Sequence, residues 1–515
     1  MSVVQSVDNV ALLPAYLAAG TAVLVLLADL LVGRAGATVA VAGTGVVATG
    51  VGAVVVGAAG TRRTFCVGAD CSWVFDGRAA LVAGVFALLT LGVLGLSGPL
   101  LRGGPTPVGE YCFLLACSMT GGVVLGAAGD LITLIVALET LTLPLYVLVG
   151  LRRGSLASAE AAVTFFVVSV VATTVTLLGA ALLYAATGGL HLGRLGGLLA
   201  DAPDVPLVPA AVALVVLGLA FKVAAVPFHA WAPATYDGAP LPVAAYLSTA
   251  SKLGGVVALL AVVQRALPAE VTGPVLALLA VLTMTVGNLV ALRQRRTVRL
   301  LAWSSVAQAG YILAPLGVLA STAGRGDDVR AGAYAAAVAY AVFFVVVELA
   351  AFAALVALRP AGADGGAVAD LRGVARRRPW AGAAFALALV GLAGLPPGLA
   401  GLFAKVTVVR AVLDGGAGWL ALVVALNAVI GLAYYLRLAA TLYADPIRVP
   451  TGPAGEPAAA GFPARTGQPT APVGGAPGVT PGRVAWPVSV ALAGATALAV
   501  VIGFAPQLVL DLASR

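Results

Sequence analysis

Three lysines are the residues in this sequence with the clearest chemical potential. Lys222, Lys252 and Lys405 are the only lysines in 515 residues, and each lies in a long apolar stretch, whereas the 26 arginines lie almost entirely in connecting segments. A lysine at the centre of a bilayer costs about 2.5–3.5 kcal/mol on insertion scales, so it needs a partner or a function there. Burial disfavours the ammonium form, so a buried lysine, unlike an arginine, can release a proton. The pattern predicts proton handling within a membrane.

The acidic counterpart is Glu139, near the middle of the apolar run Leu131–Leu148. An isolated carboxylate at that depth would be neutral unless it were paired. We therefore predict an ion pair between Glu139 and Lys222, whose opening would remove the counter-charge of the lysine and release its proton. The alternative is a buried pair with a purely structural role.

His229 and Lys252 follow Lys222 closely in the chain. A histidine changes charge near neutral pH, so His229 could relay protons between the two lysines. The alternative is a histidine that only makes local hydrogen bonds. Lys252 lies on the next apolar segment, where we expect it to continue the path.

The elements that must position these residues are membrane helices. The composition is 61% hydrophobic and 10% charged, with a mean hydropathy of +1.06. A membrane helix needs about 20 apolar residues, and the sequence offers about fourteen such runs. We predict an all-α polytopic membrane protein in contact with the lipid bilayer. The net charge of +8 lies mostly in loop arginines, so the sequence offers no basic domain for nucleic acid.

Loop arginines indicate the orientation. With fourteen spans, sixteen arginines fall in the loops after odd-numbered spans and nine on the other side. Because cytoplasmic loops carry the excess of positive charge, this count predicts that both termini are periplasmic or extracellular. Cys66 and Cys71 then lie in an outer loop, Thr61–Arg78, where they could be a disulfide or two free thiols.

Two apolar segments that carry lysines are interrupted by proline. Lys222 precedes Pro227 in Leu219–Pro233, and Lys405 follows Pro396–Pro397 in Gly391–Val406. A proline inside a helix removes a hydrogen bond and frees a carbonyl, so both segments are predicted to be broken helices rather than simple kinks. Paired broken helices are typical of transporters built from inverted repeats.

Four segments carry a resemblance to a known family: LITLIVALETLTLPLYVLVGLRR, GLAFKVAAVPFHAWAPATYDGAPLPVAAYLSTASK, GNLVALRQRRTVRLLAWSSVAQAGYIL and LAGLPPGLAGLFAKV. They resemble the antiporter-like membrane subunits of respiratory complex I, the bacterial NADH:quinone oxidoreductase. By this resemblance, Glu139 corresponds to the glutamate of the fifth helix, and Lys222 and Lys252 to the lysines of the seventh and eighth helices. Lys405 corresponds to the lysine of the broken twelfth helix, which favours the subunit N branch of the family.

The resemblance also implies an organisation into about 14 transmembrane helices with two inverted five-helix repeats and two broken helices. We expect an N-terminal three-helix segment at 1–108, half-channel repeats at 109–266 and 267–444, and a final transmembrane helix at 484–515. The segment 445–483 is rich in Pro, Gly and Ala, and we expect it to be a flexible cytoplasmic loop.

The resemblance implies a bacterial plasma-membrane protein that translocates protons while other subunits transfer electrons from NADH to quinone. We expect no cofactor in this chain, since the sequence has no flavin, nucleotide or cluster motif. FMN, iron–sulfur clusters and quinone are expected in partner subunits. The partners would be the peripheral and membrane subunits of complex I, including neighbouring antiporter-like subunits.

One departure from the family pattern is Glu348, an acid where a small or amide residue is expected. It could pair with Lys252 or Lys405, or face a wet cavity as a neutral acid. Two other functions stay open. The chain could belong to a multi-subunit Na+/H+ antiporter or a membrane-bound hydrogenase, or it could be a structural subunit without its own proton path.

Overall fold

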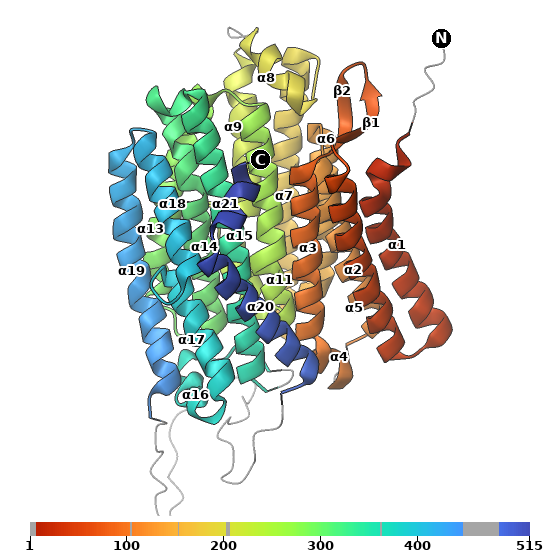
Figure 1. The fold of residues 1–515 in the computed structure, drawn as a ribbon, viewed down its shortest axis with the longest axis vertical. Helices are drawn as coiled ribbons and strands as arrows, with labels where there is room; N and C mark the ends of the chain where they lie inside the picture. Colours follow the sequence, from red (N-terminus) through yellow and green to blue (C-terminus); the bar gives the residue numbers. More distant parts are fainter. Residues whose placement is uncertain are drawn as a thin grey trace, which may run out of the picture.

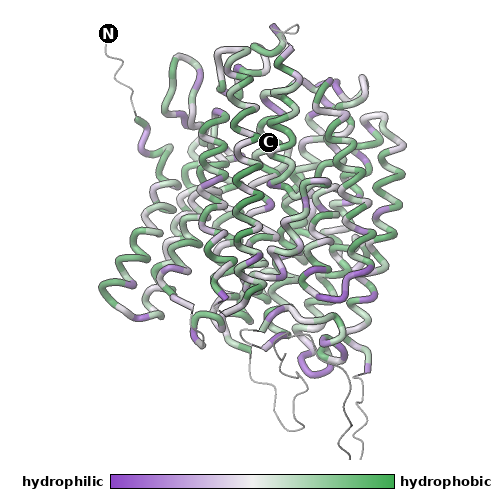
Figure 2. Tube along the Cα trace, turned by 180° about the vertical axis from the view of Figure 1, so that it is seen from behind, coloured by the Kyte–Doolittle hydropathy of each residue, from purple (hydrophilic) through white to green (hydrophobic). Residues whose placement is uncertain are grey.

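The computed structural model describes residues 7–103, 106–152, 154–201, 206–360, 363–445 and 484–514. Within these residues, helices stand side by side in one bundle (Figure 1). Twelve of them are long and apolar enough to cross a membrane, and two shorter apolar helices, Leu207–Val223 and Pro379–Ala393, begin the two broken segments. These add up to the fourteen crossings that the sequence predicts. Figure 2 shows hydrophobic residues along most of the helices and hydrophilic stretches in the connecting segments.

The N-terminal part of the bundle contains five helices: α1 (Asn9–Val32), α2 (Ala35–Ala58), α3 (Gly77–Leu96), α4 (Gly98–Gly103) and α5 (Val108–Ala127). Asp8 caps α1 by accepting hydrogen bonds from the N–H groups of Val10 and Ala11. The hydrogen bond from the Ala11 N–H is the main cause that lowers the pKa of this carboxyl, with further help from Arg62. Such a cap satisfies helix N–H groups that have no partner within the helix.

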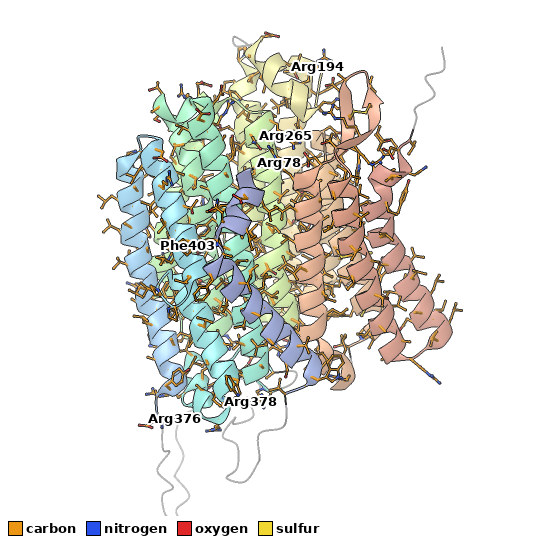
Figure 3. All side chains as sticks on the ribbon, viewed as in Figure 1. Arg78, Arg194, Arg265, Arg376, Arg378 and Phe403 are labelled. Carbon is orange, nitrogen blue, oxygen red and sulfur yellow. A yellow bond between two sulfur atoms is a disulfide. The ribbon has the colours of Figure 1, made fainter. Side chains whose placement is uncertain are left out.

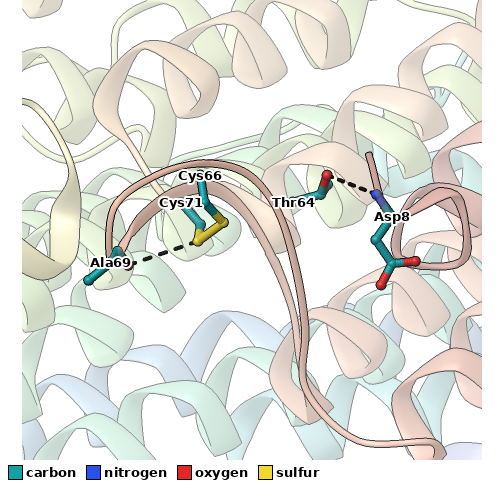
Figure 4. Close-up of a disulfide and its surroundings, with 5 residues drawn as sticks. All are labelled: Asp8, Thr64, Cys66, Ala69 and Cys71. Atoms are coloured by element: carbon teal, nitrogen blue, oxygen red, sulfur yellow. Dashed lines mark hydrogen bonds between the residues drawn. A yellow bond between two sulfur atoms is a disulfide. The ribbon is translucent and has the colours of Figure 1, made fainter. Parts of the chain in front are cut away.

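The segment predicted as an outer loop contains a β-hairpin, β1 (Arg62–Val67) and β2 (Asp70–Phe75), with Gly68 in a left-handed conformation at the turn. Cys66 and Cys71 face each other across the strands and form a disulfide, which decides between the two states left open. The Asp8 N–H donates to Thr64 Oγ1 over 3.1 Å (Figure 4), so the hairpin is attached to the start of α1.

The next part contains the first broken segment. Its elements are α6 (Leu131–Val149), α7 (Leu156–Thr187), α8 (Leu192–Ala200), α9 (Leu207–Val223), α10 (Trp231–Gly238), α11 (Leu241–Tyr246), the π-helical turn η1 (Leu247–Ser251) and α12 (Lys252–Arg265). Helix α9 ends at Ala224, which has a left-handed φ of 61°, and the Val226–Pro227 peptide bond is cis. The break therefore occurs directly after Lys222, where the proline predicts it.

The second broken segment lies among the remaining elements. These are α13 (Ala269–Ala291), α14 (Thr297–Leu313), the 3-10 turns η2 (Ala314–Ala320), η3 (Ala323–Arg325) and η4 (Val368–Leu371), and α15 (Asp327–Leu358), α16 (Val374–Arg377), α17 (Pro379–Ala393), α18 (Leu399–Asp414), α19 (Gly418–Tyr443), α20 (Trp486–Phe504) and α21 (Gln507–Ser514). The chain breaks between α17 and α18, where Gly394 has a φ of 80° and the Pro396–Pro397 bond is cis.

Helix α15 forms the centre of this part of the bundle. It has 32 residues and packs against α11, α14, α17, α18, α20 and α21. Most of its side chains are buried, as expected for a helix that is apolar on every side. The segment 446–483, most of the predicted flexible loop, lies outside the described residues, and the repeat boundaries stay a prediction.

Candidate functional site

Lys222 and Glu139 form an ion pair in which the lysine is buried and the acid is mostly buried. Lys222 lies in the last turn of α9, beside the break, and its Nζ is 2.7 Å from Oε1 of Glu139 in the middle of α6. The side chain of Lys222 is 7% exposed and that of Glu139 is 20% exposed. A helix C-terminus favours positive charge, so the break supplies a suitable position for the lysine. The structure thus contains the ion pair that the sequence predicts.

Hydroxyl groups surround this pair. The Nζ of Lys222 also donates to Ser169 Oγ over 2.8 Å and to Thr142 Oγ1 over 3.4 Å, while Thr173 Oγ1 donates to Glu139 Oε1 over 2.6 Å. The Tyr146 hydroxyl donates to Ser169. Our sequence reasoning missed these residues, although Ser169 and Thr173, four residues apart on the same face of α7, were a usable signal. They give the ammonium group partners besides Glu139.

Lys252 lies at the junction of η1 and α12 and is 2% exposed. Its Nζ donates to the backbone oxygen of Ser305 over 2.6 Å. One turn later, Gly255 packs against Lys222, since a Cβ at Gly255 would lie 2.7 Å from the Lys222 carbonyl carbon and oxygen. Because glycine has no side chain, α12 can contact α9 directly at Lys222. Single π-helical turns such as η1 are common at functional sites.

Glu348 lies in the middle of α15 and is completely buried. Its Oε1 accepts a hydrogen bond from Ser248 Oγ over 2.6 Å, and Ser248 Oγ also contacts Ser305 Oγ at 3.3 Å. Its Oε2 has no hydrogen-bond partner among the described residues. Of the two lysines left open as partners, Lys252 lies closer in the hydrogen-bond network, because it donates to Ser305, whose hydroxyl contacts Ser248. Among the described residues, the two make no direct ion pair.

Lys405 lies in the second turn of α18, after the second break. Its Nζ donates to the backbone oxygens of Leu392 and Ala393, at the C-terminal end of α17, with 3.2 Å to Leu392. It also lies 5.2 Å from the ring centre of Tyr311, within range for a cation–π interaction. Within the described residues no carboxylate pairs with Lys405. Its ammonium group is stabilised by helix-end carbonyls and an aromatic ring, whereas that of Lys222 is stabilised by Glu139.

A polar network connects the surroundings of Lys252 with those of Lys405. Ser304, next to Ser305 on α14, hydrogen-bonds the Tyr435 hydroxyl. Gln308 Nε2 donates to Tyr435 OH over 3.0 Å and to the Leu392 oxygen, which Lys405 also contacts. Our sequence reasoning did not single out these residues, although Ser304 and Gln308 lie four residues apart on an otherwise largely apolar helix.

His229 lies between α9 and α10 and is half-buried. Its ring packs against Trp303 at 5.0 Å, and its Nδ1 has no hydrogen-bond partner in the described part of the chain. Among the described residues, no hydrogen bond or ion pair joins it to Lys222 or Lys252. A relay role for His229 stays a prediction that this geometry does not support.

In the described ranges, no group of three or more His, Cys, Asp or Glu side chains could hold a metal ion. The chemistry that the assembled residues offer is proton transfer between lysines, carboxylates and hydroxyl groups.

Comparison with known proteins identifies the family of this chain. Residues 128–431 match the family described as NADH:quinone oxidoreductase/Mrp antiporter, TM. The chain is 76% identical, over the full length of both proteins, to the NADH-quinone oxidoreductase subunit N of Salinispora tropica. It is 45% identical to the subunit N 2 of Streptomyces griseus, with 91% of this chain and 89% of the relative covered.

Solved structures have the same fold. A chain of respiratory complex I from Thermus thermophilus is 30% identical, with 97% of this chain and 99% of that chain covered and a TM-score of 0.75. A chain of the Mrp complex from Dietzia is 24% identical, with coverages of 98% and 96% and a TM-score of 0.79, which shows a shared fold. The chain is therefore a multi-pass bacterial membrane protein that belongs to the NADH:quinone oxidoreductase/Mrp antiporter family.

Proposed function

We propose that this chain is a proton-translocating membrane subunit, of the subunit N type, in a bacterial NADH:quinone oxidoreductase. Its partners are the other membrane and peripheral subunits, and FMN, iron–sulfur clusters and quinone belong to those partners. The observation that carries the proposal is the buried Lys222–Glu139 ion pair at a broken helix, together with the full-length similarity to a subunit N.

In this proposal, electron transfer in other subunits shifts charge along the line of buried acids and lysines. When Glu139 moves away from Lys222, the ammonium keeps its hydroxyl partners but loses its counter-charge, so its proton becomes easier to release. Lys252, with Glu348 and the serines beside it, receives the proton, and Lys405 passes it to the outer side. Gln308 and Tyr435 lie between the last two lysines.

The function can be tested on tagged protein purified from native membranes in mild detergent. We expect co-purification with NADH-oxidising subunits and NADH-driven quinone reduction by the same material. Lys222→Ala should then reduce proton pumping and coupled quinone reduction together. Full coupled activity of this variant in an assembled complex would contradict the proposed role of Lys222.

Two other assignments give different outcomes in the same experiment. Purification with hydrogenase or Na+/H+ antiporter subunits would keep the lysine chemistry but change the reaction, although the likeness to the Mrp chain is one of fold. Pumping that is insensitive to substitution of both Lys222 and Lys405 would indicate a structural subunit.

We also propose that both termini are periplasmic or extracellular, from the arginine count. Arg194 and Arg376 lie at opposite ends of the bundle and are both well exposed (Figure 3). With Cys112 and Cys117 replaced by alanine, Arg194→Cys should react with a membrane-impermeant thiol reagent in intact cells, and Arg376→Cys only after lysis. The reverse pattern would invert the topology.

A further inference from the structure

A groove lined by α3, α5, α12, α15 and α21 has a cavity volume of about 160 Å³. Its walls are aliphatic along most of their length, with Val82, Val257 and Val338 as examples from three of the helices. Four of the five helices, α3, α5, α12 and α15, belong to membrane spans, so the groove lies within the membrane part of the bundle. We propose that it holds one molecule of an anionic phospholipid.

Two arginines stand at one end of the groove. Arg78 lies in the first turn of α3 and Arg265 in the last turn of α12, and Gln264 beside them accepts a hydrogen bond from Arg78 Nη1 over 3.2 Å. Figure 3 shows both arginines toward the end of the bundle that also carries Arg194. This end of the groove therefore carries two positive charges close to one membrane boundary.

Neither guanidinium has an ion-pair partner in the described part of the chain. Asp76, whose Oδ1 caps α3 at the Ala79 N–H, forms no ion pair with either arginine among the described residues. Asp511 on α21 accepts a hydrogen bond from Gln507 Nε2. Arg78 and Arg265 line the same end of the groove. A phosphate group between them would receive charge-assisted hydrogen bonds from both.

The lining of the groove suits a lipid chain, because aliphatic side chains from several helices face it. Its volume suits on the order of ten water-sized groups, and therefore part of an acyl chain. The planar guanidinium of arginine binds phosphate through two parallel, charge-assisted hydrogen bonds. The combination of an aliphatic groove with a dibasic end thus matches a phospholipid, with its phosphate at Arg78 and Arg265.

The test is to count tightly bound lipids. The full-length tagged chain is purified with its accompanying subunits and washed extensively with detergent, and the lipids are extracted and quantified by class with mass spectrometry. We expect the native protein to keep about one more phosphatidylglycerol or cardiolipin per chain than the Arg78→Gln/Arg265→Gln variant. Arg194→Gln, which removes an exposed arginine outside the groove, should retain the native amount.

A second variant distinguishes loss of the lipid site from a folding defect. Ala335→Phe fills the groove from α15 and leaves both arginines in place, and it should lose the same lipid. Added phosphatidylglycerol should raise the thermal midpoint of the native protein and not of the groove variants, whereas phosphatidylcholine should raise none, because only a ligand of the folded state stabilises it.

Two results would overturn the proposal. One is an equal amount of bound anionic lipid in the native protein and in both groove variants. The other is an equal rise in the thermal midpoint on addition of neutral or anionic lipid. The lipid count needs no turnover, so its failure leaves the proposed proton path unaffected, and failure of the proton path leaves the lipid site in place.

Discussion

Two serines in contact with each other, Ser305 and Ser248, connect Lys252 to Glu348, and the lysine and the acid form no direct ion pair. Lys252 donates to the Ser305 backbone oxygen, and Glu348 accepts from Ser248, whose hydroxyl also contacts the Ser305 hydroxyl. Lys222 and Glu139, by contrast, contact each other directly. The chain thus contains one closed acid–lysine pair and one that two serines separate.

Removing the carboxylate of the closed pair should impair pumping. Glu139→Gln leaves Lys222 buried without its counter-charge, and breaking a buried pair in this way costs about 3–5 kcal/mol. We expect proton translocation to fall on the order of tenfold to a hundredfold, the range of a lost acid–base group. The measurement is NADH-driven acidification of inverted membrane vesicles. Glu160→Gln, an exposed acid on α7, is the matched control, and unchanged pumping in Glu139→Gln would remove Glu139 from the path.

Glu348 should be required for the same activity. Glu348→Gln keeps the shape of the side chain and can still accept the Ser248 hydrogen bond, but it cannot bind and release a proton. We expect the complex to assemble, pumping to fall on the order of tenfold, and the pH–rate profile to lose one ionisation. Ser248→Ala, which removes one hydrogen bond worth about 1 kcal/mol, should leave that ionisation in place. A Glu348→Gln profile identical to the native one would make Glu348 a structural residue.

Gln308 should connect the second and third lysines. Gln308→Leu removes the donor to Tyr435 and Leu392 and the acceptor for Tyr340, and each buried polar group left unsatisfied costs about 1–3 kcal/mol. We expect reduced pumping and a lower thermal midpoint. Gln294→Leu is the control, because Gln294 lies in the loop after α13 and its side chain donates one hydrogen bond to Val290. Equal pumping in both variants would argue against a connection through Gln308.

A charged cluster at one end of the bundle should make stability depend on acid pH. Arg296 bridges Asp237 on α10 at 2.7 Å and Asp364 at 2.9 Å. Burial alone would raise the pKa of Asp364, but the hydrogen bond and charge of Arg296 outweigh burial and lower it. A lowered folded-state pKa stabilises the fold above the unfolded value of about 3.9, and this contribution is lost as the pH falls through the folded value.

The measurement is thermal unfolding of the native protein and of Arg296→Gln between pH 7 and pH 3. We expect the variant to be about 1 kcal/mol less stable at pH 7, in the range for partly exposed ion pairs, and the difference to shrink below about pH 4. Arg330→Gln, which removes an exposed pair with Asp327, should show little change. A difference that is constant with pH would show that Arg296 acts without Asp364.

The sequence predicts the membrane helices, the breaks and the first ion pair because each follows from local chemistry. Apolar length predicts a span, Pro227 predicts the break after Lys222, and Glu139 is an acid that needs a partner at membrane depth. The β-hairpin was missed because strands of six residues between helices leave a weak pattern.

The polar network around Gln308 could not be derived in the same way. Gln308 and Tyr435 are 127 residues apart in the chain, and their contact depends on how α14, α17 and α19 pack. A serine, tyrosine or glutamine in an apolar helix can equally contact its own backbone, as Thr142 does with Leu138. The partner of Glu348 also stayed open for this reason, since only the packing of α15 against η1 brings Ser248 to it.

Ser304 and Ser305 are adjacent on α14, and successive residues of a helix point about 100° apart. Ser305 contacts Lys252 and Ser248, and Ser304 contacts Tyr435. Both contacts therefore belong to one helix, and a rotation of α14 about its own axis would alter them together. The orientation of this one helix would then change the contacts at the Lys252 site and at the Lys405 site at the same time.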